Sequence, residues 1–214
     1  MNTLQHFADK FGFNPRQNSP IEIQKINRVI MAQTLGELGF TIGAEVGVAA
    51  GDHSETLLQN IPGLTLYCID PWVRMDGFAS FSDNTLHGWH ERAKEKLSKY
   101  EKCFMVQKTS MDAVRGFKDR SLDFVYIDGA HDFKNVAMDI CEWIRKVREG
   151  GVLFGHDFET IAGGKYPCHV EDIVTAYANS HQLDKWFILG MKTDLRGRSV
   201  GEYREGVRSW MYIL

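Results

Sequence analysis

The amino-acid sequence predicts an α/β fold built on one mostly parallel sheet, and two features of the chain support this. Short, β-rich apolar segments alternate with helical segments from residue 41 to residue 190, as in strands joined by crossover helices. Strands such as 122–128 are apolar almost throughout, which is typical of a sheet covered on both faces. The last connection, 191–208, has three glycines, many charges and no apolar periodicity. Because a parallel crossover normally contains a helix, we predict that the last strand is antiparallel.

The predicted elements follow in order along the chain. Residues 1–20 are polar and mixed, so we expect a short extension there, and the apolar spacing within 21–39 predicts a helix. The predicted strands are 41–48, 64–70, 103–107, 122–128, 151–157, 186–190 and 209–214. The predicted helices are 53–60, 85–100, 110–117, 133–148 and 169–180. As helix caps we expect Asp52 or Ser54, Ser110 and Asp132.

Composition limits the class of protein. The chain has 214 residues, 43% of them hydrophobic and 25% charged, with a net charge of -3, which fits a single globular domain. The near-neutral charge argues against a nucleic-acid partner, and no apolar run is long enough to span a membrane. The N-terminus lacks the pattern of a secretory signal, and the four cysteines are widely spaced without a CxxC pair. We therefore expect a cytoplasmic protein without disulfides or a zinc site.

A glycine-containing turn, E-x-G-x-x-x-G, lies where strand 41–48 gives way to a helix. Gly47 and Gly51 would let the backbone turn sharply and let a ligand approach closely, at the edge of a parallel sheet where ligands bind. Glu45 would repel a pyrophosphate and instead suits a ligand with a positive end, such as an amino acid or a sulfonium. Asp70 ends the next strand, where a carboxylate can accept hydrogen bonds from ribose hydroxyls. The alternative is a tight turn without a ligand.

A second polar group follows two apolar strands. Asp128, His131 and Asp132 come at or after the end of strand 122–128, and His156 and Asp157 end strand 151–157. Both strand ends face one crevice if the strands are parallel. We expect Asp132 to cap the next helix, and the other side chains to be candidates for chemistry.

At these positions the chain resembles a known family. It is similar to class I S-adenosylmethionine-dependent methyltransferases in four stretches: EVGVAAG, YCIDPW, KTSMDAV and DFVYIDGAHDFKNVAMDICEWIRKVREGGVLFGHDF. The last stretch resembles a branch of small bacterial O-methyltransferase-like proteins related to macrocin O-methyltransferase. The resemblance implies a Rossmann-like, seven-stranded, mostly parallel sheet with helices on both faces and an antiparallel last strand. It implies a cofactor-binding domain over 41–214, preceded by an N-terminal extension and helix over 1–40, in a single domain overall. The cofactor contacts that it implies are Glu45, Gly47 and Gly51 at the methionine end, Asp70 at the ribose, Ser110 and Met111 at the adenine, and Asp128.

The resemblance also implies methyl transfer to a hydroxyl of a small molecule, sugar-like or phenol-like. Two mechanisms fit the residues. In one, His131 or His156 is a general base, and Asp128 is a further candidate catalytic residue. In the other, Asp128, Asp157 and His156 bind a divalent cation. Metal-dependent relatives carry an acid where this chain has His156. Because magnesium prefers oxygen ligands, this departure counts against magnesium and leaves manganese or another transition metal open.

Other interpretations stay open at the level of sequence. A nucleotide-dependent oxidoreductase could use a similar sheet, although Glu45 and the absence of G-x-G-x-x-G argue against it. A noncatalytic S-adenosylmethionine-binding protein would keep the cofactor pocket without turnover. The residues also leave open a homodimer and methylation of nitrogen instead of oxygen. Aromatic residues in 71–91, or the segment 159–172, could form a wall for the methyl acceptor.

Overall fold

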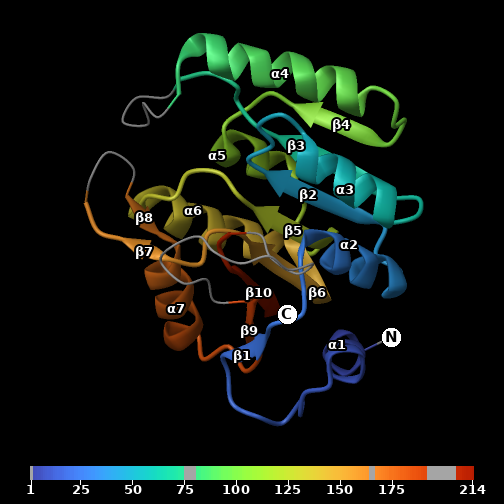
Figure 1. Cartoon of the computed structure of the whole chain (residues 1–214), viewed down its shortest axis with the longest axis vertical. Coiled ribbons are helices and arrows are strands. Elements are labelled where there is room, and N and C mark those ends of the chain that lie inside the picture. The colour runs from blue at the N-terminus through green and yellow to red at the C-terminus, as the bar shows by residue number, and fades with distance from the viewer. Residues whose placement is uncertain (1, 75–80, 164–166, 192–205) are drawn as a thin grey trace.

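The computed structural model describes residues 2–74, 81–163, 167–191 and 206–214. Its centre is an eight-stranded sheet with the strand order β1-β9-β10-β6-β5-β2-β3-β4 (Figure 1). These strands are β1 Ile21–Ile23, β2 Ile42–Val46, β3 Thr65–Ile69, β4 Cys103–Val106, β5 Leu122–Ile127, β6 Val147–Gly155, β9 Trp186–Leu189 and β10 Ser209–Ile213. A separate pair is formed by β7 Thr160–Ile161 and β8 Cys168–His169.

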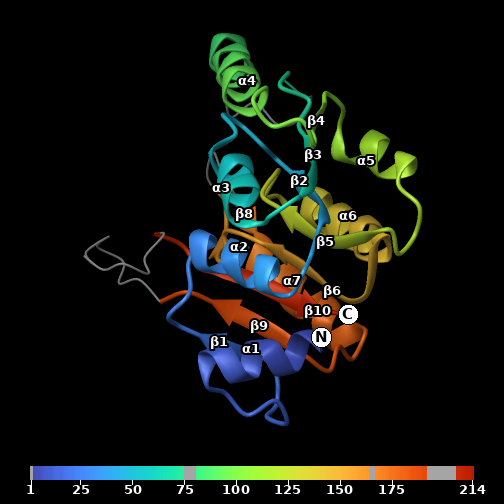
Figure 2. The same cartoon turned by 90° about the vertical axis from the view of Figure 1, so that its right-hand side faces the viewer.

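Helices cover both faces of the sheet. The helices are α1 Thr3–Phe11, α2 Arg28–Glu37, α3 Asp52–Asn60, α4 Asp83–Leu97, α5 Ser110–Ala113, α6 Phe133–Trp143 and α7 Val170–Ser180, with short 3₁₀ turns at Val114–Gly116 and Ile144–Lys146. Helices α2 and α3 lie on one side of the sheet and α5 and α6 on the other (Figure 2). Among the described helices, none combines the length and apolar character needed to cross a membrane.

The predicted Rossmann-like fold is confirmed. Strands β2, β3, β4, β5 and β6 pair in parallel, whereas β10 pairs antiparallel with both β6 and β9. Each face of the sheet carries a hydrophobic core, and successive side chains of β5 point alternately into the two cores. Phe124 and Tyr126 pack on the side of α2 and α3, and Val125 and Ile127 pack on the side of α6. The parallel strands end at one edge of the sheet, where the candidate site lies.

The N-terminal region differs from the prediction. β1 pairs in parallel with β9 and adds an eighth strand to the predicted seven. The predicted helix over 21–39 is shorter, because α2 begins at Arg28 after the cap Asn27. Ile21 and Ile23 are buried and Glu22 is exposed, which is the alternation of a strand. The apolar residues that follow have helical spacing, so the predicted helix includes this short alternation. The expected extension contains α1, whose Phe7 is fully buried.

Two of the expected helix caps are also different. Gly51, not Asp52 or Ser54, occupies the N-cap position of α3 and makes no side-chain cap. Thr109, not Ser110, caps α5 by accepting from the Asp112 amide. Asp132 caps α6 as predicted.

Candidate active site

The glycine turn after β2 is held against the loop after β5. Gly47 has φ +91°, and a Cβ added there would lie 2.1 Å from the Asp128 carbonyl oxygen. Gly51 has φ +79°, where a Cβ would meet a Leu97 methyl at 3.3 Å. Position 47 therefore requires glycine because the two backbones touch there. The turn that would hold a cofactor is therefore in direct backbone contact with the loop that begins at Asp128.

Glu45 lies beneath this turn and is only 1% exposed. The Ser54 hydroxyl donates to its Oε2 atom, and His53 Nδ1 is 3.4 Å from its Oε1 atom. Its neighbours Ala44 and Val46 face the opposite side of the sheet, so strand alternation directs Glu45 towards α3. The carboxylate thus places negative charge behind the turn and not on its outer surface. His53, which the sequence analysis missed, is also buried, and its position just after Gly51 was the available signal.

Asp70 braces the same turn from β3. Its Oδ2 atom accepts hydrogen bonds from the amides of Val48 and Ala49, both at 3.0 Å, and its Oδ1 atom accepts from the Trp72 amide at 2.7 Å. The buried Trp72 indole donates to the Ala49 carbonyl at 2.8 Å. Asp70 therefore fixes the turn in addition to any contact with a ribose. Of the two expected acceptor walls, residues 75–80 and 164–166 lie outside the described residues.

Ser110 and Met111 begin α5, after β4. The Ser110 hydroxyl donates to Asp139 Oδ1 and accepts from Trp143 Nε1 at 2.8 Å. Asp139 is 4% exposed. Its burial raises the pKa of the carboxyl to about 7, although the Ser110 hydrogen bond favours the ionised form. Met111 lines a shallow groove between α5 and α6. The side chain of Ser110 is thus committed to a buried network that links α5 to α6.

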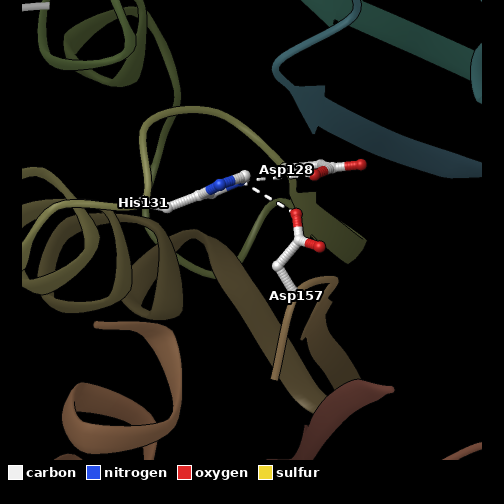
Figure 3. A group of neighbouring side chains, drawn as sticks. All are labelled: Asp128, His131 and Asp157. Atoms are coloured by element: carbon white, nitrogen blue, oxygen red, sulfur yellow. Dashed lines mark ion pairs between the residues drawn. The ribbon is translucent and has the colours of Figure 1, made fainter. Parts of the chain in front are cut away.

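Three side chains from two strand ends converge beyond the glycine turn (Figure 3). His131 Nε2 lies 3.1 Å from Asp157 Oδ2 and 3.6 Å from Asp128 Oδ1. Each of the three residues offers one atom that could bind a metal ion, and these atoms all lie within 4.8 Å of one another. His131 Nε2 is buried and makes no hydrogen bond of standard geometry with either carboxylate. A divalent cation could be bound here by the two carboxylates together with the imidazole nitrogen, which has no hydrogen bond.

The backbone and the surrounding charges hold this cluster in place. Asp157 has φ +51°, an uncommon conformation that redirects its side chain at the end of β6. Burial opposes ionisation of Asp128, but the nearby histidines and Arg28 outweigh burial and keep its pKa below the ordinary value. Burial likewise opposes charging of His131, yet the two carboxylates outweigh it and raise the pKa of the imidazole. The cluster therefore attracts positive charge.

His156 lies behind the cluster and not within it. Its Nδ1 atom is 3.1 Å from Asp157 Oδ1, its side chain is 7% exposed, and its Nε2 atom is buried without a hydrogen-bond partner. The sequence predicts His156 as a metal ligand beside Asp128 and Asp157, whereas in the structure His131 is the histidine that lies near both carboxylates. His156 directly follows β6 and its amide donates to the Ile127 carbonyl, whereas His131 lies in the loop between β5 and α6.

Comparisons with solved structures agree with this fold. An O-methyltransferase from Bacillus cereus, solved in complex with SAH, has 14% identity and a TM-score of 0.61, with 100% of this chain and 91% of that chain covered. An rRNA methylase from Streptococcus thermophilus has 10% identity and a TM-score of 0.58, with 88% and 98% covered. At such low identity these likenesses establish the shared fold alone. A search of curated protein sequences gave no match.

The family follows from the sequence match. Residues 44–158, more than half of the chain, match the model of a methyltransferase domain, and the chain belongs to this family. It is an S-adenosylmethionine-dependent methyltransferase, which removes the oxidoreductase from the candidate functions. The matched segment contains the glycine turn, Asp70 and the whole Asp128–His131–Asp157 cluster.

Proposed function

We propose that this protein transfers the methyl group of S-adenosylmethionine to a hydroxyl oxygen of a small molecule, with a divalent cation at Asp128, His131 and Asp157. The convergence of these three side chains beside the glycine turn carries the proposal. Methyl transfer is an in-line displacement at carbon, and its rate depends on holding the nucleophile, methyl group and sulfur in line. The cluster and the turn are close enough to position both reactants.

The residues at the turn have separable roles in this proposal. Gly47 and Gly51 let the methionine end of the cofactor approach the backbone, and Asp70 both braces the turn and accepts from the ribose. Glu45 supplies negative charge beneath the turn, which favours the sulfonium and ammonium groups of the cofactor. Ser110 and Met111 border the adenine, with Ser110 held in position by Asp139 and Trp143.

The donor atoms fit manganese or a similar first-row transition metal. Two carboxylate oxygens and one imidazole nitrogen suit these ions, whereas magnesium favours oxygen alone. When bound, such a cation lowers the pKa of an oxygen nucleophile that it contacts. The chain orients the ligands: Tyr126 donates to Asp128 Oδ2 at 3.1 Å, and His156 lies against Asp157. A bound cation would also satisfy His131 Nε2, the buried atom that has no hydrogen bond.

The histidine-base mechanism is the alternative, and His131 is its better candidate. His131 is 34% exposed, whereas His156 is 7% exposed and cannot reach a substrate as readily. However, the Asp157 and Asp128 carboxylates lie 3.1 Å and 3.6 Å from His131 Nε2. A cation held by these carboxylates would displace the proton of His131 and bind the nitrogen itself, so the cation-assisted mechanism uses all three side chains.

The remaining parts of the proposal rest on the sequence. We assign the acceptor to small molecules and not to nucleic acid, because the net charge is -3. The kinship with macrocin O-methyltransferase rests on the IDGAH and GGVLFGHD stretches. We also propose that the protein is cytoplasmic and forms a homodimer.

The proposal is tested by calorimetric titration with S-adenosylhomocysteine and with MnCl₂. We expect S-adenosylhomocysteine to bind the wild-type protein and manganese to bind with a separate heat. Asp157→Asn should abolish the manganese heat and leave cofactor binding nearly unchanged. Asp172→Asn is a matched control, because Asp172 also lies near a histidine, 3.5 Å from His169, but outside the cluster. Absence of S-adenosylhomocysteine binding would refute the cofactor site, and manganese binding that survives in Asp157→Asn would refute the metal site.

A further inference from the structure

His53 is a buried polar side chain that packing alone does not explain. It is the second residue of α3, directly after the glycine turn, and is 6% exposed. Within the described part of the chain, neither of its ring nitrogens has a hydrogen-bond partner, although Nδ1 lies 3.4 Å from Glu45 Oε1. Buried polar atoms without partners destabilise a fold, so native proteins keep few of them. An imidazole at this position therefore points to a role beyond packing.

The His53 ring lies against the phenol ring of Tyr126, with the two ring centroids 4.0 Å apart. The ring of Phe154 also packs on Tyr126, at 4.9 Å between centroids. Because a buried ring in a close-packed interior moves only when its neighbours move, these contacts fix the position of the phenol. The Tyr126 hydroxyl in turn donates to Asp128 Oδ2 at 3.1 Å. His53 therefore contacts Glu45 beneath the cofactor turn and, through Tyr126, reaches one of the three side chains of the cluster.

Strand pairing explains why one histidine reaches both neighbours. Glu45 and Tyr126 are register partners on β2 and β5, so their side chains project from the same face of the sheet. Helix α3 covers this face, and its first turn places His53 against both side chains. A backbone link runs beside this side-chain link, because the Asp128 amide donates to the Val46 carbonyl at 2.8 Å. The cofactor turn and the cluster are thus joined twice.

We propose that His53 is a positioning residue that makes cofactor binding and cation binding cooperative. This inference rests on the proposed function and concerns how its two sites communicate. A cofactor at the glycine turn holds the start of α3, and with it the His53 ring, in place. The ring holds Tyr126, whose hydroxyl orients the Asp128 carboxylate for the cation. Because coupling between two binding sites is reciprocal, a bound cation raises the affinity for the cofactor by the same factor.

The test measures the affinity of the protein for S-adenosylhomocysteine by calorimetry, without metal and with saturating MnCl₂. The ratio of the two dissociation constants is the coupling factor. In the wild type we expect manganese to tighten S-adenosylhomocysteine binding by roughly fivefold or more, as is typical of coupled sites. His53→Gln keeps a polar side chain near Glu45 but removes the ring contact with Tyr126, so the coupling should be lost.

Two further variants test the path on either side of the ring contact. His53→Phe removes both nitrogens and keeps an aromatic ring against Tyr126, so it should retain most of the coupling. Tyr126→Phe keeps the contact with His53 but removes the hydrogen bond to Asp128, so it should lose the coupling, as His53→Gln does. A purely structural role of His53 would not produce this pattern, because each substitution alters the same buried core.

Leu57→Ala is the matched control, since Leu57 is fully buried one turn further along α3. It should lower the melting temperature and leave the coupling factor at the wild-type value. A wild type without coupling, an unchanged factor in His53→Gln, or an equal loss in His53→Phe or Leu57→Ala would overturn the inference. Failure of the wild type to bind S-adenosylhomocysteine or manganese at all would instead refute the proposed function, and the inference with it, so the two failures are distinguishable.

Discussion

Replacing Asp139 with asparagine should remove a specific pH dependence from the stability of the protein. Asp139 is 4% exposed on α6, and the hydroxyl of Ser110 donates to it. The ordinary pKa of 3.8 rises to about 7 in the folded protein, mainly because burial penalises the charged carboxylate. The asparagine side chain would keep the size and an acceptor oxygen for Ser110 but would not titrate.

The sign and size of the effect follow from proton binding. The unfolded chain releases the Asp139 proton near pH 3.8, whereas the folded protein keeps it to about pH 7. Between these values the unfolded state binds fewer protons, so the free energy of unfolding falls as pH rises, by up to about 1.4 kcal/mol per unit. Below this range both states are protonated, and above it the difference is constant. The full loss is about 4 kcal/mol, of which about 3 kcal/mol falls between pH 5 and pH 8.

The assay is urea denaturation of the wild type and Asp139→Asn at several pH values from 5 to 8. The difference in unfolding free energy between the two proteins should shift by about 3 kcal/mol in favour of the variant over this range. Asp119→Asn is the control: the Lys146 hydrogen bond lowers the pKa of Asp119, so its contribution changes below this range and its difference should stay flat. A constant difference for Asp139→Asn would show that Asp139 ionises in the folded protein, and it would refute the reasoning from burial.

Two further predictions concern the candidate site. Gly47→Ala should abolish S-adenosylhomocysteine binding and lower the melting temperature, because the new Cβ would lie 2.1 Å from the Asp128 carbonyl oxygen. Gly51→Ala should have a smaller effect, because its nearest contact is a side chain at 3.3 Å. Equal effects of the two substitutions would contradict the close approach at Gly47. Tyr126→Phe should weaken manganese binding by about tenfold or more through loss of the hydrogen bond to Asp128. Tyr212→Phe is the control, because it removes a buried hydroxyl that donates to the Val174 carbonyl and not to the cluster. It should lower stability without changing manganese affinity. The same manganese affinity in both tyrosine variants would exclude a positioning role for Tyr126.

The architecture of the central sheet could be predicted from the amino-acid sequence alone. The alternation of apolar strands with helices predicts a parallel sheet because parallel strands need crossover connections. The polar, glycine-containing connection 191–208 predicts the antiparallel β10 for the same reason. Gly47 could be recognised because only glycine accepts its backbone conformation without strain. These features depend on local composition and order along the chain, so they can be recognised without coordinates.

Which polar side chains meet depends instead on contacts between distant segments. The sequence predicts His131 and His156 at one sheet edge, and both histidines contact Asp157, but the path of the loop after β5 brings His131 against Asp128 as well. Glu45 is buried beneath the turn because pairing in the sheet fixes which face each β2 side chain takes. The same holds for β1, whose pairing with β9 joins segments more than 160 residues apart. Such contacts depend on register and side-chain direction, which are set only when the whole sheet has formed.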